Sequence, residues 1–150
     1  MTTKPTSVNV EWSGDRRFST GHQGRPAVLL DGDGIAGPSP VDALLGALGS
    51  CVSVDVVDIL AKRRTPVASL RVDVIGERVD AVPRRITHVT LGFVISGVGI
   101  ERVHAERAIE LAVTKYCSVR DSLAADIPVV WTLELDGSGA GQLDSGKTPG

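Results

Sequence analysis

Residues 37–64 read GPSPVDALLGALGSCVSVDVVDILAKRR and carry the strongest structural signal in the chain. Ser39 is a suitable N-cap, Pro40 fits the first helical position, and Asp42 adds a negative charge at the positive end of the helix dipole. We therefore predict a helix from Pro40 to about Arg64. Its apolar residues occupy so much of the circumference that this helix should be central in the fold, with contacts on more than one side.

Cys51 lies inside this helix, and Cys117, the only other cysteine, lies in a second apolar helical stretch. Two thiols on two helices point to a redox pair. The alternative is that both pack as small hydrophobic side chains, as free cysteines commonly do. The helix face through Cys51 continues at Asp55 and Asp58, so the thiol is expected where the buried surface meets a polar groove.

Short β-rich runs and a second helix surround the first helix in sequence. Strands are predicted at residues 8–12 and 27–30, in a small amino-terminal sheet, then at 70–75 and 86–95 as an antiparallel pair, and last at 129–135. A second helix is predicted from about residue 100 to 123, with Cys117 near its end or in a break before a shorter helix. The sequence therefore predicts one domain over residues 1–136, followed by a flexible Gly/Ser-rich tail over 137–150.

Composition limits the classes of partner. Hydrophobic residues make up 42% of the chain and aromatic residues only 3%, which predicts an aliphatic core. The formal charge of −2 comes from 16 basic and 18 acidic residues scattered along the chain, so nucleic acid is not an expected partner. The amino-terminal segment has no signal-peptide pattern and no apolar run approaches the length of roughly 20 residues that crosses a bilayer, so we expect a cytoplasmic protein without a membrane partner.

The segment from Gly37 to Cys51, together with KYCSVRDSL at residues 115–123, resembles the OsmC/Ohr family of hydroperoxide reductases. The order of sheet, helix with the first cysteine, strands, helix with the second cysteine and final strand is also similar to that family. The resemblance implies an α+β fold in which antiparallel sheets wrap around two long central helices. It also implies an intertwined homodimer with two active sites at the subunit interface.

By the same resemblance, Cys51 attacks an organic hydroperoxide and Cys117 resolves the resulting sulfenic acid into a disulfide. A thiolate is the competent nucleophile, and a sulfenic acid condenses readily with a second thiol. An external dithiol would then restore the enzyme, and no cofactor is expected. Apolar neighbours such as Leu48 and Val52 are expected to favour an organic peroxide over hydrogen peroxide by burying its alkyl part.

The chain departs from the family pattern at Val41. Better-known peroxidases of this family have a glutamate there, which holds an arginine that stabilises the thiolate. Asp42 is the next residue, but one helical step turns it by roughly 100°, so its carboxylate is better explained as a first-turn charge. We hypothesise that Asp55, one turn beyond Cys51, replaces the glutamate by positioning a basic residue beside the sulfur; the alternative is a solvated or helix-pairing aspartate.

Three arginines could supply the positive charge in the amino-terminal segment: Arg16, Arg17 and Arg25. We select Arg25 as the catalytic candidate, and the alternative for each is a solvated charge at a sheet edge. Arg120, close to Cys117, could help that thiol instead.

Other chemistries have weaker support in the sequence. His22, His88 and His104 lack the close His/Cys spacing of a metal site, so no metal is expected. The run Gly32-Asp33-Gly34 lacks the spacing of a phosphate-binding loop and is explained by turn chemistry.

The second functional hypothesis is a non-catalytic dimer of the same fold that binds an apolar small molecule in its interface cleft. Val41 favours that alternative.

Overall fold

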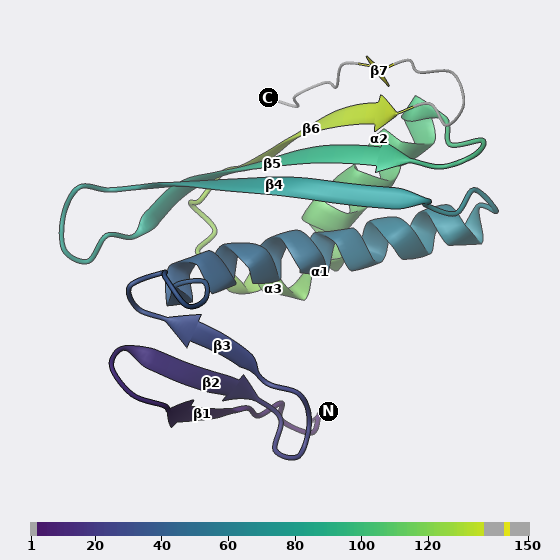
Figure 1. Ribbon diagram of the computed structural model, residues 1–150. Helices are drawn as coiled ribbons and strands as arrows, with labels where there is room; N and C mark the ends of the chain where they lie inside the picture. The colour runs from purple at the N-terminus through teal and green to yellow at the C-terminus, as the bar shows by residue number, and fades with distance from the viewer. Residues whose placement is uncertain (1–2, 137–142, 145–150) are drawn as a thin grey trace. The chain divides into compact units, whose positions relative to one another are not determined.

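The computed structural model describes residues 3–136 and 143–144 of the chain. Its contacts divide the chain into two compact units, residues 1–44 and 45–150 (Figure 1). The single domain expected over residues 1–136 stays a prediction.

The first unit contains the small amino-terminal sheet that the sequence predicts, and this sheet is antiparallel with three strands. It consists of β1 (Asn9–Trp12), β2 (Arg17–Gly21) and β3 (Val28–Asp31), in that order. The middle strand, β2, was not predicted, because Arg17–Gly21 has only one large apolar side chain. Antiparallel pairing with both neighbours supplies the backbone hydrogen bonds that this short polar segment needs.

Asp31 fixes the loop that leads from this sheet to the first helix. Its side chain is buried, and its carboxylate accepts hydrogen bonds from the backbone N–H groups of Asp33, Ile35 and Ala36. The hydrogen bonds from Ala36 and Asp33 are the main reason that the pKa of Asp31 lies below its ordinary value. Asp31 therefore remains ionised and holds the loop in one conformation.

Helix α1 (Pro40–Lys62) begins where the sequence predicts and ends two residues before the predicted boundary. Ser39 Oγ accepts a hydrogen bond from the Asp42 N–H over 3.1 Å, and the Asp42 carboxylate accepts one from the Ser39 N–H over 3.0 Å. This reciprocal pair satisfies two donors at the start of the helix.

By length and composition α1 could cross a membrane, since its mean hydropathy reaches 1.8. One of its faces, however, lies in the hydrophobic core of the second unit, through Leu48, Val52, Val56 and Leu60. It is therefore a core helix of this fold.

The second unit is built on a four-stranded mixed sheet of order β4 (Ser69–Arg78), β5 (Ile86–Ser96), β6 (Val129–Asp136) and β7 (Leu143–Asp144). The predicted antiparallel pair is confirmed as β4 and β5. In contrast to the purely antiparallel sheets that were expected, β5 and β6 are parallel. A helical crossover joins them and carries the chain back to the end of the sheet where β5 begins, so β6 starts there and runs parallel to β5.

The predicted tail at residues 137–150 is described only at Leu143–Asp144, which pair as β7 with Leu135 and Asp136. The remaining residues of that predicted tail lie outside the described residues.

The crossover contains α2 (Arg102–Leu111), a π-helical segment η1 (Ala112–Tyr116) and α3 (Ser118–Ser122). The sequence allowed either a continuous helix to Cys117 or a break at that residue, and the structure has the break. Helices α1 and α2 lie on the same side of the sheet (Figure 1). The second helix is thus shorter and more irregular than the long central helix that the resemblance implied.

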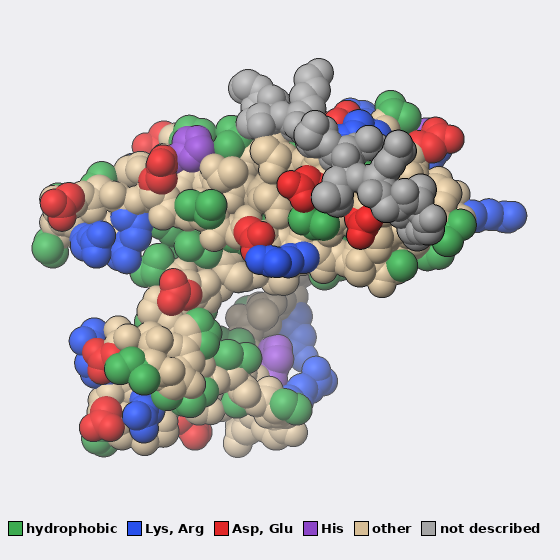
Figure 2. Space-filling view, turned by 45° about the horizontal axis from the view of Figure 1, so that its top comes forward, with side chains coloured by type: hydrophobic (Ala, Val, Ile, Leu, Met, Phe, Trp, Pro, Cys, Tyr) green, Lys and Arg blue, Asp and Glu red, His purple; other side chains and the backbone are tan. Residues whose placement is uncertain are grey.

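The core lies between the helices and this sheet. Side chains alternate along β5, so that Val89, Leu91, Phe93 and Ile95 all point into the core. Gly49 allows α1 to approach the sheet closely, because an added Cβ there would lie 2.7 Å from a methyl group of Val74 in β4. The surface carries acidic and basic side chains interspersed with apolar ones (Figure 2).

Candidate thiol site

The fold brings the two cysteines together. Cys51 is half-buried near the middle of α1, and Cys117 lies between η1 and α3 with only 3% of its surface exposed. Their side chains are in hydrogen-bond contact, and both are free thiols. The folded chain therefore brings into contact two thiols that are 66 residues apart in the sequence.

The π-helical segment explains how Cys117 reaches this position. The Cys117 N–H donates to the carbonyl oxygen of Ala112 over 2.9 Å, five residues earlier, instead of the four of an α-helix. Cys117 then leaves the helical conformation and acts as the N-cap of α3, where its Sγ accepts the backbone N–H of Arg120 over 3.3 Å. The cap fixes the direction of the sulfur.

Burial raises the pKa of the Cys117 thiol to about 11. The contact with Cys51 acts in the same direction, whereas the hydrogen bond from the Arg120 N–H opposes it. Cys117 therefore keeps its proton at neutral pH. A protonated thiol beside Cys51 can donate a hydrogen bond to that sulfur.

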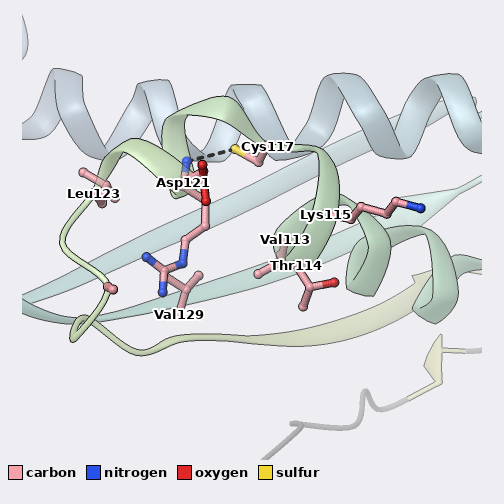
Figure 3. A pocket seen from close by; sticks show the side chains of 9 residues that line it. Val113, Thr114, Lys115, Cys117, Asp121, Leu123 and Val129 are labelled. Atoms are coloured by element: carbon pink, nitrogen blue, oxygen red, sulfur yellow. Dashed lines mark hydrogen bonds between the residues drawn. The ribbon is translucent and has the colours of Figure 1, made fainter.

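A pocket of about 370 Å³ opens beside Cys117 (Figure 3). Its walls come from η1, from α3 with the loop that follows, and from the start of β6. The Arg120 guanidinium, also in its wall, donates to the carbonyl oxygen of Ile127 over 2.8 Å, while the backbone N–H of Arg120 is the group that donates to the Cys117 sulfur. The lining residues are Val113, Thr114, Lys115, Cys117, Arg120, Asp121, Leu123, Ala125 and Val129.

A second pocket, of about 440 Å³, lies between α1 and the helix pair α2 and η1. It is the polar groove that the sequence predicts, because Asp55, Asp58 and Lys62 all line it. Two more basic side chains, Arg63 and Arg107, share the same walls. Within the described part of the chain Asp55 forms no ion pair, so its hypothesised role in positioning a basic residue stays a prediction.

Leu48 and Val52 do not form the substrate wall that the sequence analysis expected. Both are fully buried in the core, where they hold α1 against the sheet and cannot contact a molecule arriving from solvent. The exposed apolar side chain next to Cys51 is instead Val54, three residues further along α1 and 59% exposed.

The three candidate arginines lie in the first unit, whereas both thiols lie in the second. Arg16 forms an ion pair of 2.9 Å with Asp33, and Nε of Arg17 lies 4.0 Å from the Asp31 carboxylate. Arg25 is exposed and lines a small pocket at the turn between β2 and β3. Its selection as the residue that assists Cys51 stays a prediction.

Val41 and the histidines complete the set of residues considered from the sequence. Val41 is half-buried in the first turn of α1, next to the capping residue Asp42. Nδ1 of His88 lies 3.7 Å from the Glu77 carboxylate, and Nε2 of His104 lies 2.8 Å from the Arg63 guanidinium. Among residues 3–136 and 143–144, no group of three or more His, Cys, Asp or Glu side chains is arranged to hold a metal ion.

Sequence reasoning missed the pocket beside Cys117. Its lining comes mostly from one contiguous segment, residues 113–125, and the polar and charged residues that surround Cys117 in that segment could have indicated it. No pattern in the sequence indicates that the helix is interrupted at Cys117, and this interruption lets side chains from residues 113–125 line one pocket. The loop-fixing role of Asp31 was also missed, since the residue was read only as part of a turn.

Comparisons with known proteins agree on one family. Residues 31–132 match the family model described as OsmC-like protein. Protein YhfA of Escherichia coli K12 is 36% identical over 118 residues, which cover 78% of this chain and 85% of YhfA.

Solved structures share the fold. A hypothetical protein from Aquifex aeolicus is 25% identical with a TM-score of 0.75, covering 89% of this chain and 98% of that one. The organic hydroperoxide resistance protein OhrB of Bacillus subtilis is similar in fold, with a TM-score of 0.57 at 12% identity over 85% of this chain and 98% of OhrB.

Proposed function

Because the chain belongs to the OsmC-like protein family, we propose that it is a thiol-dependent peroxidase that reduces organic hydroperoxides. The observation that carries this proposal is the contact between the side chains of Cys51 and Cys117. Two free thiols in contact can form a disulfide with little movement of the backbone. The fold shared with an organic hydroperoxide resistance protein supports the choice of substrate class.

In the first step Cys51 is the nucleophile, because it is the more exposed of the two thiols. Its thiolate attacks the terminal oxygen of the hydroperoxide, and the O–O bond breaks. The sulfur becomes a sulfenic acid, and the alkoxide takes up a proton and leaves as an alcohol. Val54 offers apolar surface for the alkyl part of the substrate.

In the second step Cys117 resolves the sulfenic acid. Its sulfur attacks the Cys51 sulfur, the hydroxyl group leaves as water with the proton that Cys117 gives up, and a disulfide forms. An external dithiol then reduces this disulfide and is itself oxidised to a disulfide. No metal or organic cofactor enters these steps, and the reduced thiols suit a cytoplasmic location.

A homodimer is part of the proposal. Val54 and Val57 of α1 are 59% and 40% exposed in the single chain. A second copy of the chain would cover part of this apolar surface and leave the part of Val54 nearest Cys51 open to the substrate. The same arrangement would allow an arginine, with Arg25 as the candidate, to reach the thiol site.

The alternative function is a non-catalytic dimer that binds an apolar small molecule in its interface cleft. One observation favours it: Val41 stands where better-known peroxidases of the family have a glutamate. In that case the two cysteines are packing residues.

Peroxide consumption tests the choice between the two functions. Purified protein is mixed with a dithiol and either an organic hydroperoxide or hydrogen peroxide, and the loss of peroxide is followed. We expect faster loss of the organic hydroperoxide and no catalysed loss with Cys51→Ser. The matched control is Ser50→Ala, since the exposed Ser50 hydroxyl only donates to backbone carbonyls of its own helix. A folded wild-type protein that consumes neither peroxide would support the binding function instead.

A further inference from the structure

The pocket beside Cys117 reaches only one of the two sulfurs. Cys117 is in its wall, and of the residues that the structure describes Cys51 is not part of the lining. Cys51 nevertheless contacts the side chain of Cys117. After oxidation, one sulfur of the disulfide would therefore face this pocket.

We propose that the external dithiol enters this pocket and attacks the sulfur of Cys117, so that Cys51 is the leaving group when the disulfide is reduced. This inference rests on the proposed peroxidase function. It assigns the pocket as the reductant site, separate from the side on which Cys51 receives the hydroperoxide.

The geometry of thiol–disulfide exchange supports this assignment. The attacking sulfur approaches along the extension of the S–S bond, so it must reach Cys117 from a side that Cys51 does not occupy. The pocket provides space next to Cys117 that Cys51 does not line, and its volume of about 370 Å³ lies in the range of small-molecule sites.

The exchange proceeds in two balanced steps. A thiolate of the dithiol forms a bond to the Cys117 sulfur, the bond to Cys51 breaks, and Cys51 leaves with the electron pair as a thiolate. The second thiol of the reductant then loses its proton and attacks the reductant's first sulfur, which is bonded to Cys117 in the mixed disulfide. Cys117 departs and takes up a proton, so the dithiol is oxidised and both protein thiols are restored.

Charge and acidity agree with this direction of attack. Lys115 and Arg120 line the pocket with one carboxylate, Asp121, so the walls carry a net positive charge that favours an approaching thiolate. Burial raises the pKa of Cys117, and a thiol with a raised pKa is a poor leaving group. Attack on Cys117 does not require this sulfur to leave in the first step.

Trapping the first mixed disulfide tests the proposal. The protein is oxidised with one equivalent of organic hydroperoxide and treated with excess 2-mercaptoethanol. Samples are quenched with acid at short times and their peptides are mapped by mass spectrometry. We expect the first adduct on Cys117, with Cys51 as a free thiol; a first adduct on Cys51 would overturn the assignment. If hydroperoxide forms no disulfide, the proposed function fails, and the same mapping on a disulfide made with diamide still tests the reductant site.

A pair of neighbouring substitutions tests the pocket itself. Ala125 lines the pocket and Ala124 does not, and both side chains are exposed, so Ala125→Trp and Ala124→Trp are matched variants. We expect Ala125→Trp to slow reduction of the disulfide by dithiothreitol by about tenfold or more, because the attacking thiol loses its approach geometry. Oxidation by hydroperoxide should be unchanged in both. Equal reduction rates in the two variants would contradict the proposal.

Discussion

The backbone N–H of Arg120 donates to Sγ of Cys117 over 3.3 Å, so this cysteine caps α3 with its sulfur while burial keeps it protonated. The cap fixes the sulfur, and the buried surroundings suppress its ionisation. Cys117 is therefore a protonated thiol at neutral pH, which is the state that the proposed second step begins from.

The raised pKa of Cys117 predicts a loss of stability at high pH. Between pH 9.0, the ordinary value, and about 11, the unfolded chain loses this proton while the folded chain retains it. The contribution is therefore complete below pH 9 and disappears as pH rises through the folded pKa. A difference of two pKa units corresponds to roughly 2–3 kcal/mol.

Cys117→Ser checks this pH dependence, because serine keeps a capping acceptor but does not titrate in this range. Urea unfolding of reduced protein at pH 8 and near pH 11 should show a smaller decline for the variant than for wild type. Groups outside the contact between Cys117 and Cys51 titrate equally in both proteins, so the difference in the decline reports on this pair of thiols. An identical decline would mean that the Cys117 thiol ionises as easily in the folded as in the unfolded chain.

The same variant should arrest the proposed reaction after its first step. Without a second sulfur, the Cys51 sulfenic acid cannot become an intramolecular disulfide and should persist long enough to react with dimedone. Mass spectrometry should find one dimedone adduct on the Cys51 peptide of Cys117→Ser and little on wild type. A variant that gives no adduct after treatment with hydroperoxide would argue against Cys51 as the nucleophile.

Two glycines of α1 should respond in opposite ways to alanine. Gly46 is exposed and an added Cβ would meet nothing within 4 Å, so Gly46→Ala should stabilise the helix by up to about 1 kcal/mol. Gly49 is buried, and its Cβ would lie 2.7 Å from a methyl group of the stiff Val74 side chain. Overpacking of this kind costs about 1–3 kcal/mol.

Chemical unfolding of both glycine variants, compared with wild type, measures the two effects. We expect a higher midpoint for Gly46→Ala and a lower one for Gly49→Ala. Equal midpoints would show that α1 does not pack as closely on β4 as the structure indicates.

Asp55→Asn tests whether the Asp55 carboxylate stabilises the Cys51 thiolate by positioning a basic residue beside it. Asp55 shares its pocket with Lys62, Arg63 and Arg107, and a carboxylate there can hold positive charge one turn from the sulfur. We expect the variant to raise the pH at which Cys51 reacts with iodoacetamide and to slow peroxide consumption. The matched control is Asp58→Asn. Asp58 lines the same pocket three residues further along α1, and this variant should behave as wild type.

The opposite result has a clear meaning. An unpaired carboxylate opposes formation of a neighbouring thiolate. If Asp55→Asn left both rates unchanged or increased them, Asp55 could not be the substitute for the missing glutamate.

The features that the sequence predicted well are those with local signals. Ser39, Pro40 and Asp42 set the start of α1, and the structure has their reciprocal cap. The β-rich composition of residues 86–95 predicted β5, and one face of that strand is buried. The motif around Cys51 and Cys117 resembled the family to which the chain belongs.

The features that the sequence did not predict depend on contacts between distant segments. Strand β2 exists because β1 and β3 pair with it, and its own residues have little strand character. Parallel pairing of β5 with β6 follows from the path of the crossover and not from the residues of either strand. The burial of Leu48 and Val52 likewise depends on which face of α1 the sheet covers.

The central claim is that Cys51 and Cys117 form one redox pair, and the most direct test is the mass of the protein after oxidation. Fully reduced protein is treated with one equivalent of an organic hydroperoxide, and the intact chain and its unreduced digest are measured. The account predicts a chain lighter by two hydrogens and a peptide pair joined through Cys51 and Cys117. A chain whose mass stays unchanged even under excess hydroperoxide would contradict it.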